Sequence, residues 1–448
     1  MRRAVVSDTI YALSSGQGRA GVAVVRLSGP AVRDVFQILC GKVPPERLAT
    51  LMTVRHQGDR DIIDKGLGLC FLAPRSFTGE DMGEFQLHGG RAVVTRLLDA
   101  LSRIEGLRPA EAGEFTKRAF LNGKLDLVEV EGLGDVVSAD TEGQLKLAQR
   151  LARGGLSERV ALWRKELVCA MSLVEAAIDF SDEADVTTDI GSEVRPRVKA
   201  VLAEIEAVLD DGGRGERLRD GVVVAIAGPP NAGKSTLLNL LARREAAIVS
   251  PFAGTTRDPV EVHLELGGVP VTLVDTAGLR EGGDVVEAMG VARARERVAK
   301  SDLVLWLEPV TEKGGGMPAD LGNSLRVATK LDLAACSFSS EGLAISAVTG
   351  AGISDLLECL VSRVRELAGA EESVLIMRAR QRAALLGCAD ELRALCGRDG
   401  AADSGPEAEI ELQAEHLRRA MRALGRLVGQ VDVEEVLSEI FAAFCIGK

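Results

Sequence analysis

The stretch that decides the fold is Gly228–Thr236, which reads GPPNAGKST. It fits the phosphate-binding pattern of a glycine, four residues, and then Gly-Lys-Ser/Thr. The apolar run Val222–Ala227 before it is typical of a buried strand, and leucines at helical spacing follow it from Leu237. A loop between a strand and a helix presents backbone N–H groups to phosphate oxygens. The sequence therefore predicts a nucleotide site, in which Lys234 reaches the terminal phosphates and the Ser235 hydroxyl binds Mg²⁺.

The bulk composition narrows the class of protein. A chain of 448 residues suggests about three domains, and 46% hydrophobic residues suffice for several cores. The net charge of −12 argues against a broadly basic nucleic-acid-binding surface, and 3% aromatic residues argue against a base-stacking platform. The eight cysteines form no CxxC pair or zinc-type cluster, and no apolar run reaches the roughly 18 residues that span a bilayer. We therefore expect a reduced, cytoplasmic protein that is not attached to a membrane.

Hydrophobic patterning divides the rest of the chain. Residues 1–120 favour mixed α and β structure, whereas residues 121–215 and 371–448 favour amphipathic helices. Each helical segment has an apolar face, and the simplest way to bury both faces is to pack the two segments together. Residues 216–370 would then be an insertion, which a linker tolerates when the inserted ends lie close together. We predict an α/β multidomain protein with an N-terminal α+β domain, a helical domain and an inserted P-loop domain.

Further motifs follow the phosphate loop in the order that a nucleotide site requires. Gly254–Asp258 reads GTTRD, and its Thr256 suits a second contact with Mg²⁺. Asp275–Gly278 reads DTAG, where Asp275 would hold Mg²⁺ through water and Gly278 would offer its N–H group to the γ-phosphate. These motifs predict that the site binds a nucleoside triphosphate together with Mg²⁺.

The base-binding motifs indicate guanine. Thr329–Asp332 reads TKLD after a predicted strand, and Ser346-Ala347 follows it. The Asp332 carboxylate can accept hydrogen bonds from both N1–H and the amino group of guanine, and adenine offers no matching donors. The candidate contacts with GTP are Asn231, Ala232, Gly233, Lys234, Ser235, Thr236, Thr255, Thr256, Asp275, Thr276, Ala277, Gly278, Thr329, Lys330, Asp332, Ser346 and Ala347.

Two positions depart from the usual GTPase pattern. The base motif is usually Asn-Lys-x-Asp, but Thr329 stands in place of the asparagine. Its hydroxyl is shorter than a carboxamide, so we predict that Asp332 retains guanine selectivity while nucleotide binding is looser. Ras-like enzymes place a glutamine directly after DxxG, where this chain has Leu279. Leu279 cannot orient the attacking water, and Glu287 is a candidate for that task.

Several motifs outside the nucleotide region, taken together with it, resemble one family. The sequences are SFTGED at Ser76–Asp81, GEF at Gly113–Phe115, RAFLN at Arg118–Asn122, KLDL at Lys124–Leu127 and FCIGK at Phe444–Lys448. The chain resembles the MnmE (also called TrmE) tRNA-modification GTPases along essentially its whole length. The C-terminal spacing also mimics a prenylation box, but a terminal lysine is not favoured there, and we reject the lipid interpretation.

The resemblance implies a second site in the N-terminal domain. That domain would be a folate-binding fold that also forms a homodimer. Arg26, Glu84, Lys124 and the terminal Lys448 would contact a tetrahydrofolate one-carbon donor, such as 5-formyltetrahydrofolate. Cys445 would lie near this site, where the family suggests a catalytic role for it.

The resemblance also implies how GTP is hydrolysed. Two nucleotide-binding domains would meet across the dimer, and K⁺ would take the place of an arginine finger. A fixed cation beside the β- and γ-phosphates offsets the charge that develops on the leaving group. The metal contacts would be Ser235 and Thr256 for Mg²⁺, and Asn231 with the loop that contains Ser250, Phe252 and Thr255 for K⁺. Ser250 is a further candidate nucleotide contact, and Glu287 matches the family's water-orienting glutamate.

The implied function is the modification of tRNA. With a flavin-dependent partner, MnmG, in a heterotetramer, such proteins are expected to add an aminomethyl or carboxymethylaminomethyl group to carbon 5 of the wobble uridine. GTP hydrolysis would act as a conformational switch. The alternative is a ribosome-assembly GTPase of the Era type, which should carry a basic RNA-binding domain after its nucleotide domain. This chain carries an acidic, Leu/Ala-rich helical tail instead. A membrane-associated GTPase finds no support in an anchor or a basic amphipathic helix.

Overall fold

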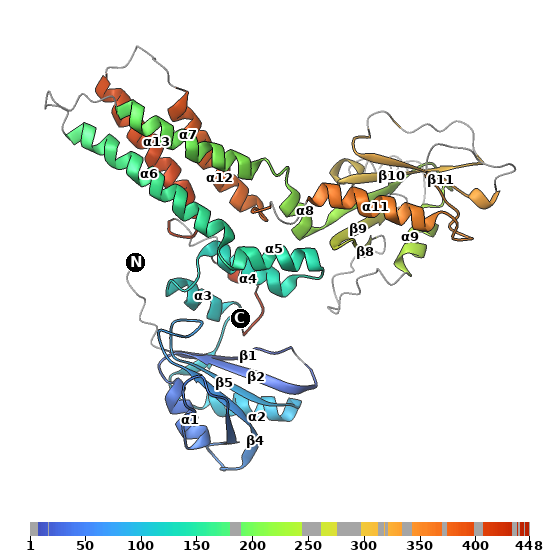
Figure 1. Ribbon diagram of the computed structural model, residues 1–448. Coiled ribbons are helices and arrows are strands. Elements are labelled where there is room, and N and C mark those ends of the chain that lie inside the picture. Colours follow the sequence, from blue (N-terminus) through green and yellow to red (C-terminus); the bar gives the residue numbers. More distant parts are fainter. Residues whose placement is uncertain are drawn as a thin grey trace, which may run out of the picture. The chain divides into compact units, whose positions relative to one another are not determined.

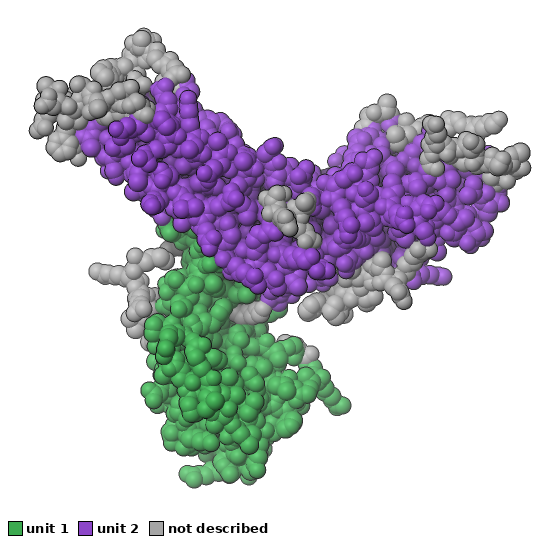
Figure 2. Space-filling view, in the orientation of Figure 1, with its two compact units in different colours: residues 1–134, 425–448 green, residues 135–424 purple. Residues whose placement is uncertain are grey.

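The computed structural model divides the chain into two compact units (Figure 2). One contains residues 1–134 and 425–448, and the other contains residues 135–424. The structure describes residues 8–16, 18–179, 190–243, 261–275, 297–311, 318, 321–333, 343–369, 374–397, 406–431, 437, 440–442 and 444–447. The domain boundaries expected at residues 120, 215 and 370 stay a prediction.

The first unit is built on a six-stranded sheet in the order β3-β4-β5-β2-β1-β6, in which only the β1–β6 pair is parallel. Its strands are β1 (Thr9–Leu13), β2 (Ala20–Ser28), β3 (Thr50–Arg55), β4 (Ile62–Phe71), β5 (Met82–Gly89) and β6 (Leu107–Pro109). Helices α1 (Val32–Cys40) and α2 (Arg91–Ser102) bury their apolar stripes against one face of this sheet. Phe36 of α1 and Phe85 of β5 lie at the centre of this core, with ring centroids 4.7 Å apart.

The end of the chain returns to the first unit. Helix α3 (Glu114–Leu121) and the start of α4 (Leu127–Ser138) pack against Phe441 and Phe444. Ile446 forms an antiparallel bridge with Ala112, just before α3. The Ser14 hydroxyl donates to the carbonyl of Gly447 at 2.9 Å. Residues far apart in the sequence therefore build one compact body.

The second unit contains a six-stranded sheet, with several helices before it and several after it in the sequence. They are α5 (Glu142–Ala152), α6 (Gly155–Asp179), α7 (Ile190–Leu209) and α8 (Arg214–Asp220) before the sheet, and α12 (Ala379–Cys396) and α13 (Pro406–Leu427) after it. Helix α7 packs against both α6 and α12 (Figure 1). Leu167 and Val174 of α6 and Leu417 and Leu424 of α13 are fully buried. The helical segments expected to bury their apolar faces together therefore do so.

The sheet of the second unit has the order β12-β11-β10-β7-β9-β8, and all its pairs are parallel except β8–β9. Its strands are β7 (Val222–Ala227), β8 (Glu261–Leu266), β9 (Val269–Asp275), β10 (Leu303–Pro309), β11 (Ser324–Thr329) and β12 (Leu343–Ala344). Helices α9 (Lys234–Ala242) and α11 (Ile353–Ala368) accompany them. The carboxyl ends of β7, β9, β11 and β12 meet at one edge, where ligands bind in such sheets. This is the P-loop fold that the sequence predicted.

Candidate nucleotide and cofactor sites

The phosphate loop connects β7 to α9 through backbone conformations that favour glycine. Gly228 has φ 142°, and a Cβ atom at this position would lie 2.3 Å from the carbonyl oxygen of Leu307. Gly233 has φ 91°. Lys234 is buried at the start of α9, and its Nζ donates to the carbonyls of Gly228 at 2.9 Å and Pro229 at 2.8 Å. The lysine ammonium is therefore held over the loop that is predicted to surround phosphate.

Two oxygen ligands suited to Mg²⁺ converge beside the loop. The Ser235 hydroxyl donates to Oδ2 of Asp275, the last residue of β9, at 2.6 Å. Asp275 is 3% exposed. Mg²⁺ is usually held by one or two carboxylates together with substrate phosphates and water, and this donor set fits that pattern. No cluster of three histidine, cysteine or acidic side chains that could hold a metal ion occurs in the described part of the chain.

Four predicted base-binding residues, Thr329, Lys330, Asp332 and Ala347, line one cavity of about 180 Å³. Thr329 is buried at the end of β11, and its hydroxyl donates to the carbonyl of Ala232 in the phosphate loop at 2.8 Å. Asp332 is exposed, and its Oδ1 accepts a hydrogen bond from the Ser346 hydroxyl at 2.6 Å. Cavity-lining residues include Ala232, Gly233, Thr236, Thr329, Lys330, Asp332 and Ala347. The fold therefore brings three separate motifs to one pocket.

A second cavity, of about 580 Å³, lies in the first unit. Arg26 of β2 and Glu84 of β5 are cross-strand partners, and Arg26 Nε donates to Glu84 Oε1 at 3.1 Å. Lys124 also lines this cavity, so three of the four predicted folate contacts share it. The Arg26 guanidinium lies 5.9 Å from the centroid of the Phe115 ring. The further lining residues include Arg47, Phe71, Arg75, Phe77 and Thr116.

Sequence reasoning missed three polar residues of this cavity. Arg47 and Arg75 join Arg26 and Lys124 in a cationic wall, against which Glu84 is the one acidic lining residue among those described. The Thr116 hydroxyl is buried without a hydrogen-bond partner in the described part of the chain. Burying an unpaired hydroxyl costs free energy, so a polar ligand at this cavity would satisfy it. The only signal for Thr116 was its place beside the GEF motif.

The motifs around the second cavity support it through a buried ion-pair network. The side chain of Arg118 is 3% exposed and contacts carboxylates of Asp8, Glu80 and Glu114 at 3.0 to 3.1 Å. Burial raises the pKa of Glu114, but hydrogen bonds from Arg108, the Glu111 N–H group and Arg118 outweigh it and leave that pKa below its ordinary value. Glu80 lies in the SFTGED loop, whose first residues line the cavity. The network therefore fixes the loop that forms one cavity wall.

Comparisons with known proteins now decide the family. The model described as "MnmE helical domain" matches residues 127–445, and the model described as "GTP-binding protein TrmE N-terminus" matches residues 9–124. The chain belongs to the MnmE family. The tRNA modification GTPase MnmE of Azorhizobium caulinodans is 53% identical over 442 residues, which cover 99% of each chain. The MnmE proteins of Beijerinckia indica (49% identical, covering 100% of this chain and 98% of the relative) and Parvibaculum lavamentivorans (50% identical, 98% and 100%) are similar along their whole lengths.

Membership in the MnmE family confirms the prediction of a GTPase and the predicted fold class. The full-length matches also favour this family over the ribosome-assembly alternative. In the described part of the chain, no helix has the length and apolar character needed to cross a bilayer.

Several predicted site residues lie outside the residues that the structure describes. They are Ser250, Phe252, Thr255, Thr256, Thr276, Ala277, Gly278, Glu287 and Lys448. Asn231 is described; it is exposed and has φ 62° within the phosphate loop. Cys445 is exposed in the first unit, one residue before the bridge between Ile446 and Ala112. This bridge precedes α3, the helix that contributes Thr116 to the second cavity.

Proposed function

We propose that this protein is the GTP-hydrolysing subunit of a complex that adds an aminomethyl or carboxymethylaminomethyl group to carbon 5 of the wobble uridine in certain tRNAs. The observation that carries the proposal is that one chain of the MnmE family contains both a pocket lined by the predicted base-binding motifs and a separate cationic cavity in its N-terminal unit. A GTP switch alone would not need the second cavity. Binding of a one-carbon donor would account for the second cavity.

The nucleotide site is proposed to act as the switch. Lys234 would bind the terminal phosphates, and Ser235 with Asp275 would hold Mg²⁺, which offsets phosphate charge when bound. Asn231, together with Ser250, Phe252 and Thr255, would hold K⁺ and so replace an arginine finger. Glu287 would orient the attacking water. Among the described residues, the exposure of Asn231 within the phosphate loop supports this proposal.

The second cavity is proposed to bind tetrahydrofolate, as 5-formyltetrahydrofolate or a related form. The Glu84 carboxylate can accept hydrogen bonds from the N–H groups of an aminopyrimidinone ring. Arg47, Arg75 and Lys124 suit the glutamate carboxylates at the other end of a folate, since arginine pairs with carboxylates in bidentate fashion. Two phenylalanines supply apolar walls for the ring system. When bound, the folate would supply the one-carbon unit, and Cys445 and Lys448 would complete the site.

The proposed partners are a second copy of the chain, a flavin-dependent MnmG-type protein and tRNA, in the cytoplasm. An apolar patch supports homodimerisation through the first unit. Leu51 of β3 and Leu67 of β4 are cross-strand neighbours, 69% and 38% exposed, on the sheet face opposite α1 and α2. Burial of this pair against a second copy of the chain would remove exposed apolar area from water. A dimer through this face would account for them.

Binding and hydrolysis assays on one purified protein test the combination of sites. We expect hydrolysis of GTP but not ATP, faster in KCl than in NaCl, and binding of 5-formyltetrahydrofolate by calorimetry. Asp275→Ala should abolish hydrolysis while folate binding remains. Glu84→Gln should weaken folate binding by at least about tenfold, because a charge-assisted hydrogen bond is lost. Glu105→Gln, an exposed residue outside the cavity, should change neither activity. A protein that hydrolyses GTP but binds no folate would contradict the two-site proposal.

A further inference from the structure

Two strands of the second unit lead to the Mg²⁺ ligands from a common starting region. Strands β7 and β9 are adjacent and parallel, with Val222 opposite Val271 and Ile226 opposite Asp275. At their carboxyl ends lie the phosphate loop and Asp275. At their amino ends lie α8 and the tight turn Gly267-Gly268 between β8 and β9. The seven residues of β9 extend over about 20 Å, so these amino ends are far from the phosphates.

The first turn of α5 contacts the starting point of both strands. The Gln144 side chain donates to the carbonyl of Arg219, near the end of α8, at 2.7 Å. The backbone N–H of Gly143 donates to the carbonyl of Gly268, in the β8–β9 turn, at 3.3 Å. Gln144 also takes part in a capping box with Thr141, which fixes the conformation of this turn of the helix. The first turn of α5 thus contacts residues that precede β7 and β9, the two strands that end at the nucleotide site.

The contact at Gly143 leaves no room for a side chain. A Cβ atom on Gly143 would lie 2.5 Å from the Gly268 carbonyl oxygen and 3.2 Å from a methyl group of Leu218. Gly143 does not have a positive φ, so packing rather than backbone conformation requires glycine here. On its other side, the turn is held by Arg365 of α11, whose Nε donates to the Gly267 carbonyl at 3.0 Å. A displacement of α5 would therefore displace the β8–β9 turn or break its contact with Gly143.

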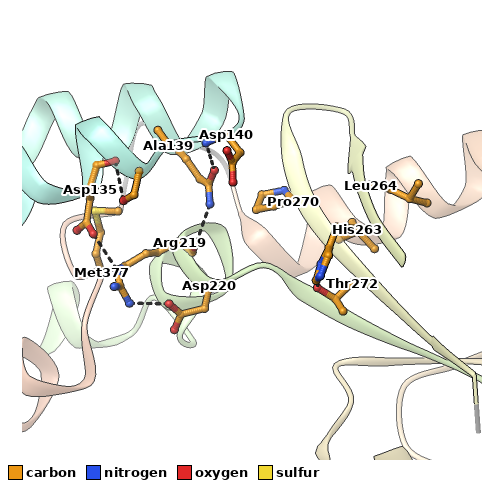
Figure 3. A pocket seen from close by; sticks show the side chains of 13 residues that line it. Asp135, Ala139, Asp140, Arg219, Asp220, His263, Leu264, Pro270, Thr272 and Met377 are labelled. Carbon is orange, nitrogen blue, oxygen red and sulfur yellow. Dashed lines mark hydrogen bonds and ion pairs between the residues drawn. The ribbon is translucent and has the colours of Figure 1, made fainter. Parts of the chain in front are cut away.

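The surroundings of this contact contain a cavity and a shared ion pair (Figure 3). The cavity, of about 360 Å³, is lined by residues from α4, α5, α8, β8 and β9. Arg219 lies between two carboxylates. Its Nε contacts Asp135 at 3.0 Å, and its Nη1 contacts Asp220 at 2.5 Å. Arg378 contacts the same oxygen of Asp135 at 2.7 Å. Helices α4 and α8 and the segment of Arg378 are therefore joined through one carboxylate oxygen beside this cavity.

We propose that the first turn of α5, through Gly143 and Gln144, is the positioning contact that couples the nucleotide state to the helical region. A shift of Asp275 or of the phosphate loop when GTP is hydrolysed would pass along β9 and β7 to this turn. The inference rests on the proposed function, because it takes the site to bind GTP and Mg²⁺. Coupling is reciprocal in binding free energy, so a change at α5 must alter the preference of the distant site for one nucleotide over another.

A matched pair of alanine substitutions tests this contact. Gly143→Ala should push the β8–β9 turn away, whereas Gly387→Ala introduces the same change into α12, where a Cβ atom meets nothing within 4 Å. The readout is the ratio of affinities for a non-hydrolysable GTP analogue and for GDP, measured with fluorescent nucleotides. We expect Gly143→Ala to change this ratio by about fivefold or more and Gly387→Ala to leave it within twofold. Equal ratios in both variants and the wild type would overturn the proposal.

Hydrogen exchange on the unaltered full chain provides a test that does not depend on the folding of a variant. The peptide that contains Gly143 should exchange at different rates in the GDP and GTP-analogue states, because the Gly143 N–H is the donor in the contact. A peptide from α12 around Gly387 should exchange equally in both states. Equal exchange at Gly143 would also overturn the proposal. A wild-type protein that binds no guanine nucleotide would instead refute the proposed function, so the two failures are distinguishable.

Discussion

The Asp332→Asn substitution would invert the base preference of the nucleotide site. Asp332 Oδ1 accepts from the Ser346 hydroxyl at 2.6 Å, and an asparagine amide oxygen can keep that bond. The variant therefore retains the pocket wall but loses the charge that faces the base. Guanine presents two donors to the carboxylate. An asparagine NH₂ group is itself a donor, so it cannot accept a hydrogen bond from guanine. Xanthine carries a carbonyl in place of the guanine amino group, so it matches the amide.

The expected loss follows from two charge-assisted hydrogen bonds. Each contributes about 1.5–3 kcal/mol, and the exposure of Asp332 favours the lower figure. A loss of about 3 kcal/mol corresponds to roughly a hundredfold weaker binding of GDP. Competition of GDP, xanthosine diphosphate and ADP against a fluorescent guanine nucleotide measures this change. Asp355→Asn, an exposed acid on α11 outside the pocket, is the control. GDP affinity within threefold of wild type, or no gain for xanthosine diphosphate, would refute the assignment of Asp332.

Four other changes test separate parts of the account. Thr329→Asn should tighten GDP binding in equilibrium titrations, because an amide supplies a longer donor together with an acceptor; unchanged affinity would count against the role given to Thr329. Ser235→Ala should raise the Mg²⁺ concentration needed for half-maximal GTP hydrolysis by at least about tenfold, and an unshifted Mg²⁺ titration would remove Ser235 from the metal site. Arg118→Met should lower the free energy of unfolding of the first unit by about 3–5 kcal/mol in denaturant titrations, because it leaves buried carboxylates unpaired. The pKa of Glu114 is lower in the folded chain than its ordinary value of 4.5. The ionised Glu114 carboxylate therefore stabilises the fold above pH 4.5, and this stabilisation is lost as the pH falls below 4.5. A thermal unfolding midpoint that does not decrease between pH 6 and pH 4 would contradict this.

The P-loop fold and the GTPase activity were predictable because short, contiguous sequence motifs encode them. Gly228–Thr236 alone specifies a strand, a loop and a helix, and the order of the later motifs along the chain places them at one edge of a parallel sheet. The predicted contact of Asp332 with guanine follows from the hydrogen-bonding groups of the base. Each of these inferences needs only local sequence and general topology.

Long-range contacts lay beyond sequence reasoning. Arg47 lies outside every motif quoted from the sequence, and Arg75 directly precedes the SFTGED motif without belonging to it, yet both line the second cavity. Arg118 could equally have been a surface residue, and only the approach of three carboxylates from distant segments shows that it is buried. Gly143 belongs to no motif in the sequence, and only the structure shows that it lies against the β8–β9 turn. Such contacts are set by how elements meet, which residue spacing along one element does not encode.

Mass spectrometry of tRNA nucleosides tests the central claim most directly. Cells that lack the gene would be complemented with the wild-type chain, with Asp275→Ala or with Cys445→Ser. The account predicts that carbon-5-substituted wobble uridine disappears without the gene and returns only with the wild-type chain. Unchanged wobble uridine in the cells that lack the gene would contradict the proposed function and leave a GTPase of the MnmE family that acts elsewhere.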